Sequence, residues 1–191
     1  EQMRDLLEVE IDKMEKLASF IPHGADGVIT VPFYNGERTP ALPKAKASIF
    51  GLDNQNTTNA HLIRSAMEAA IFNLKAGIDA FKRTGMSFNE VTLTGGGSNS
   101  ALWRQICADI LNLPVRVLKE QENAAFGAAL QALWAYKKYN NGSESISIIT
   151  STHLEIDQDK SHAPDKNSVA LYEKTYQNYK TFVSLIASHY K

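Results

Sequence analysis

The sequence predicts a layered α/β fold, and three observations support this class. Two short apolar segments, 91–94 and 114–118, are each followed by a helical pattern, and strands that alternate with helices are typical of such domains. A long segment that begins near Thr57 or Thr58 and ends before Gly85 repeats apolar residues at steps of three and four, which predicts one amphipathic helix. The hydrophobic fraction of 43% and the charged fraction of 21% over 191 residues are ordinary for a soluble globular domain.

The N-terminal part of the chain is predicted to contain helix, strand and loop in that order. Residues 1–17 place apolar side chains at helical spacing among acidic and basic ones. No capping residue stands before Glu1, and the sequence does not begin with Met. We therefore expect the chain to be a portion of a longer protein. Residues 28–31 follow a turn and are predicted to form a strand, and residues 35–46, with two prolines, are predicted to form a loop.

The C-terminal half is predicted to continue the alternation. Ser98 or Asn99 is expected to cap a helix that runs to about Leu111. Residues 140–167 are polar and are predicted to form a surface loop. A last helix, rich in tyrosine, is expected over residues 168–190.

Composition and charge exclude several classes of function. The formal net charge of −1 gives no general attraction to nucleic acid or to anionic lipid. No apolar run reaches the roughly 20 residues needed to span a bilayer, and the charged N-terminus does not resemble a signal peptide. Cys107 is the only cysteine and the five histidines show no metal-ligand spacing, so we predict neither a disulfide nor a metal site. A cytoplasmic location is expected.

Three consecutive glycines, Gly95 to Gly97, follow the strand at 91–94 and are the first feature that points to chemistry. Glycines let the backbone turn sharply and let a ligand approach it closely. The helix that starts afterwards offers backbone N–H groups and the positive end of its dipole, which suits a nucleotide phosphate. A tight strand-to-helix turn without a ligand explains the same residues, because the segment is neither a Walker loop nor a complete GxGxxG motif.

Two further segments admit both a functional and a structural interpretation. A helix of small residues is expected from about Asn123, and it contains Gly127, although glycine costs a helix about 1 kcal/mol relative to alanine. Close packing of this helix on the sheet would explain the glycine, and so would a helix that backs a nucleotide site. Glu37 and Arg38 lie in the loop NGERTP, where they could position a phosphate or a neighbouring domain, or belong to a solvated turn.

Taken together, these segments resemble the FGGY family of carbohydrate kinases. Residues 47–68 (ASIFGLDNQNTTNAHLIRSAME) fit the second signature of that family at its constrained positions. Residues 33–40 (FYNGERTP), 91–110 (VTLTGGGSNSALWRQICADI) and 122–130 are similar to the branch of the family that phosphorylates D-xylulose, as is the tail from residue 162 onwards. The resemblance covers nearly the whole chain, in the order of the family.

The resemblance implies that residues 1–191 form a part of the C-terminal lobe of the actin-like, ribonuclease-H-like ATPase fold. ATP, with Mg²⁺, lies between the two lobes of that fold, and the C-terminal lobe holds adenosine and part of the phosphate chain. Gly96 and Ser100 match nucleotide positions of the family, and Gly36 matches a loop glycine near the phosphates; some relatives have Asn where Ser100 stands. The nucleotide-binding residues that the resemblance implies are Gly36, Gly95, Gly96, Gly97, Asn99 and Ser100.

Two motifs of the family are absent from this sequence. The catalytic aspartate of the family lies in a Gly-Asp dipeptide, and the N-terminal lobe carries an Asp-x-Gly-Thr phosphate loop; neither occurs in these 191 residues. We therefore assign no catalytic residue and expect this chain alone to be inactive. The function implied for the intact enzyme is the ATP-dependent conversion of D-xylulose to D-xylulose 5-phosphate.

The resemblance leaves alternatives open. Another sugar kinase of the family, acting on gluconate or ribulose, would fit the same signatures. A non-catalytic actin-like module that binds a nucleotide, or assembles through an exposed sheet edge, would fit them as well. The implied partners are the sugar, ATP, the missing N-terminal lobe of the same enzyme and, if the enzyme is a homodimer, a second copy. Neither nucleic acid nor a membrane is expected as a partner.

Overall fold

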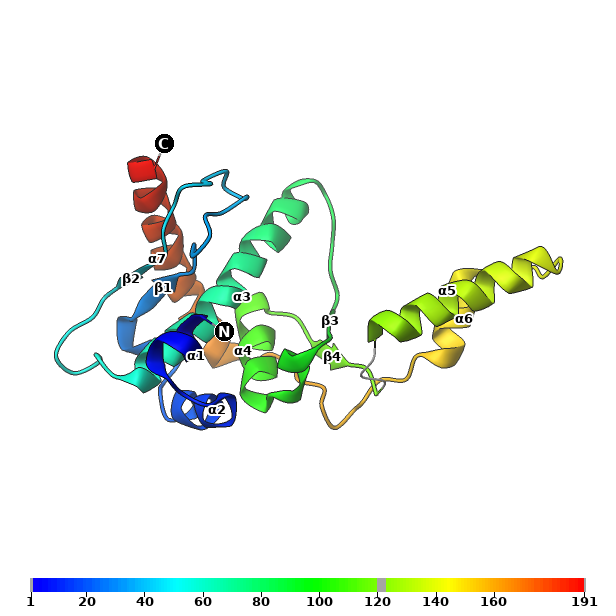
Figure 1. Cartoon of the computed structure of the whole chain (residues 1–191), viewed down its shortest axis with the longest axis horizontal. Coiled ribbons are helices and arrows are strands. Elements are labelled where there is room, and N and C mark those ends of the chain that lie inside the picture. Colours follow the sequence, from blue (N-terminus) through cyan, green and yellow to red (C-terminus); the bar gives the residue numbers. More distant parts are fainter. Residues whose placement is uncertain (1, 120–122, 191) are drawn as a thin grey trace.

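The structure, a computed structural model, describes residues 2–119 and 123–190 (Figure 1). Its helices are α1 (Gln2–Leu7), α2 (Ile11–Ser19), α3 (Asn59–Arg83), α4 (Ala101–Leu111), α5 (Asn123–Tyr139), α6 (Ile146–His153) and α7 (Lys166–Tyr190). Its strands are β1 (Ile29–Val31), β2 (Ser48–Phe50), β3 (Val91–Leu93) and β4 (Val115–Val117). The alternation of strand and helix confirms the predicted α/β class.

The strands form two small sheets. Strand β1 pairs with β2 in the antiparallel sense, with Ile29 opposite Phe50. Strand β3 pairs with β4 in the parallel sense, with Val91 opposite Val115, as expected when a helix connects the two. Among the described residues no strand pairs with the other side of β3, so this edge of the sheet is open. Strand β2 is a difference from the prediction, because its three residues are too few to show a pattern.

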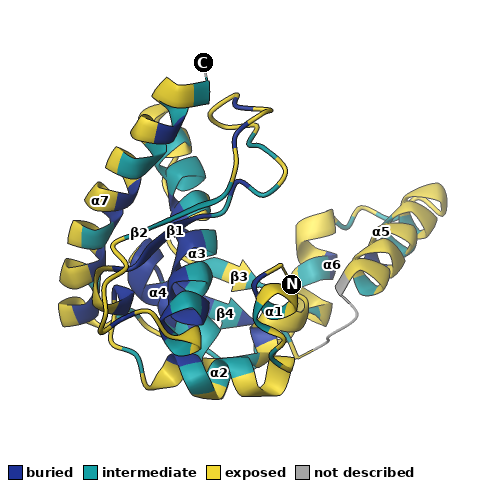
Figure 2. Ribbon diagram, turned by 60° about the vertical axis from the view of Figure 1, so that its left-hand side comes forward, coloured by how far each residue is buried: buried dark blue, intermediate teal, exposed yellow. Residues whose placement is uncertain are grey.

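Helix α3 is the centre of the body, the name used here for α1 to α4, α7 and the four strands. Thr58 caps it, as predicted, and accepts a hydrogen bond from the backbone N–H of His61 through its hydroxyl. The helix ends at Arg83, before Gly85, whose φ of +90° suits glycine alone. Helix α3 contacts α2, α4, β1 and α7, and the buried residues gather where these elements meet (Figure 2).

Aromatic side chains join the C-terminal helix α7 to this centre. Phe72 on α3 packs against three tyrosines of α7, with ring centroids 5.4 to 6.1 Å apart; these are Tyr172, Tyr176 and Tyr179. All three tyrosines are buried. Such rings bury large apolar areas, and edge-to-face or offset pairs add to that stabilisation. The tyrosine-rich tail is therefore part of the core of the body.

A buried ion pair lies beside this aromatic cluster. The Nε of Arg64 donates to Glu68 Oε1 at 2.7 Å, and the side chains are only 3% and 2% exposed. The same carboxylate oxygen accepts from the Tyr172 hydroxyl at 2.8 Å and from the backbone N–H of Gly24 at 3.0 Å. Burial raises the pKa of Glu68, whereas the Arg64 guanidinium and these hydrogen bonds oppose the rise. The cluster links α3, α7 and the turn before β1.

Helices α5 and α6 form a second unit, which we name the arm. The arm extends away from the body in Figure 1, and α5 packs against α6. Most alanines of α5 are exposed, and a Cβ added at Gly127 would meet nothing within 4 Å. Close packing of this helix on a sheet, one of the two explanations that the sequence suggests for Gly127, is therefore not observed among the described residues.

Three predicted boundaries need correction. Ser100, rather than Ser98 or Asn99, caps helix α4, because residues 96–99 first form one turn of 3-10 helix. The segment 140–167 is not entirely loop: it contains α6, whose Ile149 is buried. Residues 1–17 contain a break at Glu8, whose φ is +52°, so two short helices form there.

Candidate functional site

The glycine segment forms a braced loop between β3 and α4. Gly95 has φ +79° and ψ −171°, a conformation that residues with a Cβ rarely adopt, so a glycine is required at this turn. The hydroxyl of Ser98 donates to the carbonyl of Gly95 at 2.7 Å. The buried Arg104 donates through Nη1 to the carbonyl of Ser98 at 2.7 Å. The loop is therefore held in one shape by its own helix.

The glycines of this loop leave space in front of the backbone. A Cβ added at Gly95 or Gly96 would meet nothing within 4 Å, whereas one at Gly97 would lie 3.3 Å from Nε1 of Trp103. The open side at Gly96 is the geometry that a ligand lying against the backbone requires. At Gly97 the neighbouring indole supplies a structural reason for the absence of a side chain.

The first turn of α4 is capped by side chains. The backbone N–H of Trp103 donates to Oγ of Ser100 at 3.0 Å. The backbone N–H of Leu102 donates to Oε1 of Glu15, which comes from α2, also at 3.0 Å. Hydrogen bonds from backbone N–H groups to a carboxylate are stronger than those between neutral groups. The start of α4 is where the sequence predicts a phosphate site. Two of its backbone N–H groups, those of Leu102 and Trp103, already have hydrogen-bond partners within the protein.

A cleft of about 610 Å³ opens between α2 and the glycine loop. Cavities that hold small molecules are typically about 300 to 1,000 Å³, so its size fits a nucleoside or nucleotide. The residues that line it are Ile11, Asp12, Met14, Glu15, Met67, Gly96, Gly97, Asn99, Ser100 and Trp103. Of the six residues predicted to bind the nucleotide, Gly96, Gly97, Asn99 and Ser100 lie here, and Gly95 precedes them in the same loop.

The sixth predicted residue, Gly36, lines a neighbouring cleft of about 370 Å³. The two clefts share Met14, Met67 and Trp103 as common lining residues. Gly36 has φ +74°, and an added Cβ would lie 2.5 Å from the carbonyl oxygen of Pro43. The close approach of its own loop thus explains this glycine without a ligand.

The charged residues of the same loop have structural partners. Oε1 of Glu37 accepts from the backbone N–H groups of Arg38 and Thr39, and Oε2 accepts from the Asn73 amide at 2.9 Å. These hydrogen bonds lower the pKa of Glu37 against the opposing effect of its partial burial. The Glu37 carboxylate therefore holds the loop in shape and ties it to α3.

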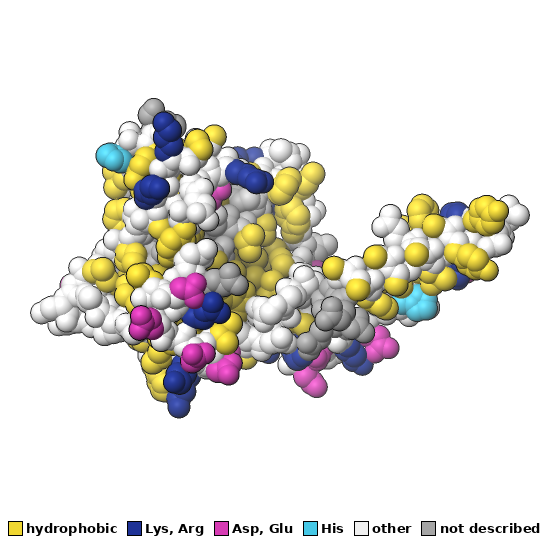
Figure 3. All heavy atoms as spheres, viewed as in Figure 1, with side chains coloured by type: hydrophobic (Ala, Val, Ile, Leu, Met, Phe, Trp, Pro, Cys, Tyr) yellow, Lys and Arg dark blue, Asp and Glu magenta, His cyan; other side chains and the backbone are white. Residues whose placement is uncertain are grey.

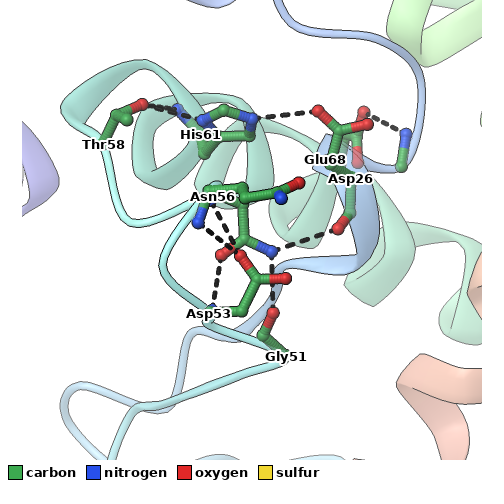
Figure 4. A network of polar contacts seen from close by, with 9 residues as sticks. Asp26, Gly51, Asp53, Asn56, Thr58, His61 and Glu68 are labelled. Atoms are coloured by element: carbon green, nitrogen blue, oxygen red, sulfur yellow. Dashed lines mark hydrogen bonds and ion pairs between the residues drawn. The ribbon is translucent and has the colours of Figure 1, made fainter.

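The segment 51–58, which leads into α3, is also fixed by polar contacts (Figure 4). The side-chain amide of Asn56 donates to the carbonyls of Gly51 at 2.9 Å and Asp26 at 3.2 Å. Nε2 of His61 lies 3.0 Å from Oδ2 of Asp26. A Cβ at Gly51 would lie 2.2 Å from the carbonyl oxygen of Gly27, so the two turns touch through backbone. This part of the second signature therefore shapes the body rather than lining either cleft.

Sequence reasoning missed the contribution of α2 and α3 to the cleft. Met14 and Glu15 belong to a segment whose sequence pattern predicts an amphipathic helix. The pattern does not predict the element against which that helix packs. Trp103 lines both clefts and also packs against the core of the body. A signal for Glu15 could not be found in the sequence, because its partner Leu102 is 87 residues away.

Neither a metal site nor a membrane-spanning helix occurs in the described part of the chain. Residues 2–119 and 123–190 contain no group of three or more His, Cys, Asp or Glu side chains placed to hold a metal ion. Over the same residues, no helix combines the length and the hydropathy that crossing a membrane would require. Cys107 is buried, and burial raises the pKa of its thiol to about 11. It is therefore not a reactive thiolate at neutral pH.

Comparison with known proteins decides the family. Residues 4–136 match the C-terminal domain of the FGGY family of carbohydrate kinases. The chain belongs to this family. The xylulose kinase of Haemophilus influenzae is 40% identical over 183 residues, which are 96% of this chain and 36% of that protein. The gluconokinase of Bacillus licheniformis is 33% identical over 85% of this chain and 31% of its own length.

Solved structures confirm the predicted fold. The xylulose kinase from Rhodospirillum rubrum aligns with a TM-score of 0.82 at 22% identity, over 98% of this chain and 37% of that one. The ligand-bound xylulose kinase from Lactobacillus acidophilus aligns with a TM-score of 0.80 at 26% identity, over 96% of this chain and 36% of that one. This FGGY chain is thus part of the C-terminal lobe of an actin-like, ribonuclease-H-like fold. It spans about a third of the length of the relatives it matches.

Proposed function

We propose that this chain is the nucleotide-binding C-terminal portion of an ATP-dependent xylulose kinase. The intact enzyme would convert D-xylulose to D-xylulose 5-phosphate. The observation that carries the proposal is the 40% identity to the xylulose kinase of Haemophilus influenzae along 96% of this chain. The match to this relative covers 183 residues and so extends beyond the family domain at residues 4–136.

In this proposal the cleft between α2 and the glycine loop holds the nucleotide. Gly95, Gly96 and Gly97 would let it lie against the backbone, and Asn99 and Ser100 would contact it from the start of α4. The open space at Gly96 and the size of the cleft support this placement. Gly36 would lie at the adjoining cleft, behind the wall formed by Met67 and Trp103.

The chemistry of phosphoryl transfer divides the work between this chain and the rest of the enzyme. The transfer needs in-line positioning, neutralisation of the phosphate charge and a base near the attacking hydroxyl. Mg²⁺ would supply the neutralisation when it arrives with ATP. This chain would position the nucleotide and form one wall that excludes water. The base and most sugar contacts would come from the part of the enzyme outside this chain, which would close over the cleft.

Steady-state kinetics of the full-length protein test the proposal. D-xylulose is expected to be phosphorylated with a higher kcat/KM than gluconate, ribulose or glycerol. The 191-residue chain alone is expected to show no turnover, because it lacks the Gly-Asp and Asp-x-Gly-Thr motifs. Turnover of D-xylulose by this chain alone would contradict the division of work.

A second candidate function is that of a gluconate kinase. It is favoured by the gluconokinase of Bacillus licheniformis, which is 33% identical over 85% of this chain. The gluconate kinase structure from Lactobacillus acidophilus also aligns, with a TM-score of 0.78 at 27% identity. A kcat/KM for gluconate above that for D-xylulose in the same experiment would select this function.

A further inference from the structure

A third cleft, of about 310 Å³, lies between the C-terminal end of α2 and the side of α4. Among the described residues, none lines both this third cleft and either of the two clefts described above. Its volume is at the lower end of the range for cavities that hold small molecules, about 300 to 1,000 Å³. Its apolar wall consists of Phe20, Ile21, Pro22, Leu102 and Ile106.

Asp109 brings a buried carboxylate to the lining of this cleft. The residue is only 1% exposed, and its Oδ1 accepts from the Gln105 amide and from the backbone N–H of Asp165, each at 2.8 Å. Within residues 2–119 and 123–190, no hydrogen bond reaches Oδ2 and no Lys, Arg or His forms an ion pair with this carboxylate. Burial raises the pKa of Asp109, as expected for a carboxylate without a counter-charge. A cation in the cleft would supply that counter-charge.

The two basic residues of the lining do little to oppose a cation. The charge of Arg64 is compensated by Glu68, whose Oε1 lies 2.7 Å from Nε of Arg64. Burial and the nearby Arg64 charge lower the pKa of His23, so its ring is neutral at pH 7. Nε2 of His23 lies 3.3 Å from Oγ of Ser168, which itself donates to Asp165. Nε2 is therefore the donor in this contact, and Nδ1 of the neutral ring keeps a lone pair that can accept.

The mouth of the cleft also favours a cation. Helix α2 ends at Ser19, which lines the cleft, and the last carbonyl groups of a helix carry the negative end of its dipole. The next residue, Phe20, is 74% exposed, and an aromatic ring both covers apolar groups and attracts cations. A single carboxylate is too little for Mg²⁺ or Ca²⁺, which take several oxygen ligands. The apolar wall therefore suits an organic cation better than a metal ion.

We propose that the third cleft binds a small organic cation, a primary ammonium group on an apolar chain. The ammonium group donates to Oδ2 of Asp109, and the chain lies against Phe20, Leu102 and Ile106. The site is separate from the clefts assigned to the nucleotide, so this inference goes beyond the proposed function and does not depend on it.

An NMR titration of the full-length protein with n-butylammonium tests the site. The methyl groups of Leu102 and Ile106 report on the third cleft, and that of Met67 reports on the other two. We expect the signals of Leu102 and Ile106 to shift with a Kd of roughly 1–10 mM, and that of Met67 to stay in place. The uncharged analogue 1-butanol should bind at least about tenfold more weakly, because it lacks the charge that pairs with Asp109.

Three variants of the full-length protein assign the charge and the wall. Asp109→Asn keeps an oxygen that accepts from Gln105 and Asp165 but removes the charge, and it should weaken n-butylammonium binding at least about tenfold. Asp159→Asn removes an exposed charge outside the cleft and should change the affinity less than about twofold. Phe20→Ala removes an exposed ring at the mouth and should weaken binding about two- to fivefold.

Three results would overturn the inference. They are the absence of a saturable shift at Leu102 and Ile106, an equal affinity for n-butylammonium and 1-butanol, and an unchanged affinity in Asp109→Asn. If Asp109→Asn does not fold, the comparison with 1-butanol and the Phe20→Ala variant decide, because Phe20 is exposed and its loss leaves the core intact. An unchanged affinity in Phe20→Ala would then overturn the inference as well.

Discussion

The body and the arm are both largely helical, but they differ in how much each helix buries. Helices α3, α4 and α7 share one continuous core with β1 and β4. In α5 the buried hydrophobic residue is Leu130, and in α6 it is Ile149. Apolar side chains of the arm face solvent in Figure 3, and Tyr136 and Tyr139 are 68% and 87% exposed. Helical periodicity alone therefore does not show how firmly a helix is held.

The largest expected effect comes from breaking the buried ion pair of the body. Glu68→Ala leaves Arg64 buried without its carboxylate, so the free energy of unfolding should fall by about 3–5 kcal/mol. Urea unfolding of the full-length protein measures it. The control is Glu144→Ala in the arm, whose half-buried pair with Lys137 remains open to water and should contribute less than about 1 kcal/mol. Equal losses in the two variants would contradict the comparison.

Gly51→Ala should have the next largest effect. The new Cβ would lie 2.2 Å from the backbone oxygen of Gly27, and Gly51 has a φ of +79°, so backbone must move. We expect a loss of about 2–3 kcal/mol in thermal unfolding experiments. Gly85→Ala is the matched control, because Gly85 also has a positive φ but open space around it, and should cost about 1 kcal/mol. A smaller loss for Gly51→Ala than for Gly85→Ala would show that the contact is not tight.

Gly127→Ala sharpens the comparison on the side of the arm. Because nothing lies within 4 Å of an added Cβ, the 191-residue chain should gain about 0.5–1 kcal/mol in stability from better helix propensity. Thermal unfolding followed by circular dichroism measures the gain. The same substitution in the full-length protein tests the arm in its complete setting. A loss of stability there, with a gain in the shorter chain, would mean that another part of the protein packs against α5.

The smallest expected effect is a pH dependence within the body. Burial raises the pKa of Asp109, although the backbone N–H of Asp165 and the Gln105 amide oppose the rise. The pKa of the Asp109 carboxyl is higher in the folded protein than in the unfolded chain, so its ionisation destabilises the folded state. The full cost applies at pH values above the folded pKa and disappears as the pH falls below the unfolded pKa. Asp109→Asn should therefore raise the free energy of unfolding at pH 7 by less than about 1 kcal/mol, and by nothing near pH 3.

Unfolding at several pH values measures this effect in the full-length protein. Asp159→Asn is the control, because Asp159 is exposed and the substitution should change stability equally little at both pH values. If Asp109→Asn raised the free energy of unfolding by the same amount at pH 3 as at pH 7, the charge of Asp109 would not be the cause of the gain.

Local patterns were enough to place most helices and strands and to find the glycine loop. The stripe of α3, its Thr58 cap and the turn before Gly85 depend on residues within a few positions of one another. The resemblance to the family was visible for the same reason, because its motifs are short and continuous. Helix α6 and strand β2 were missed, since each is too short for its periodicity to stand out.

Long-range contacts decided what the loops and helix ends do. The sequence predicts a phosphate site at the start of α4. In the structure, a backbone N–H group there donates to the carboxylate of Glu15, which is 87 residues away in the sequence. The sequence gives no reason why Gly36 and Gly51 must be glycines. The folded chain supplies the reason, because backbone atoms of other segments lie where a Cβ would be. The physical reason is common to these cases: a hydrogen bond or a close approach depends on which segments meet in space, and local spacing carries no record of that meeting.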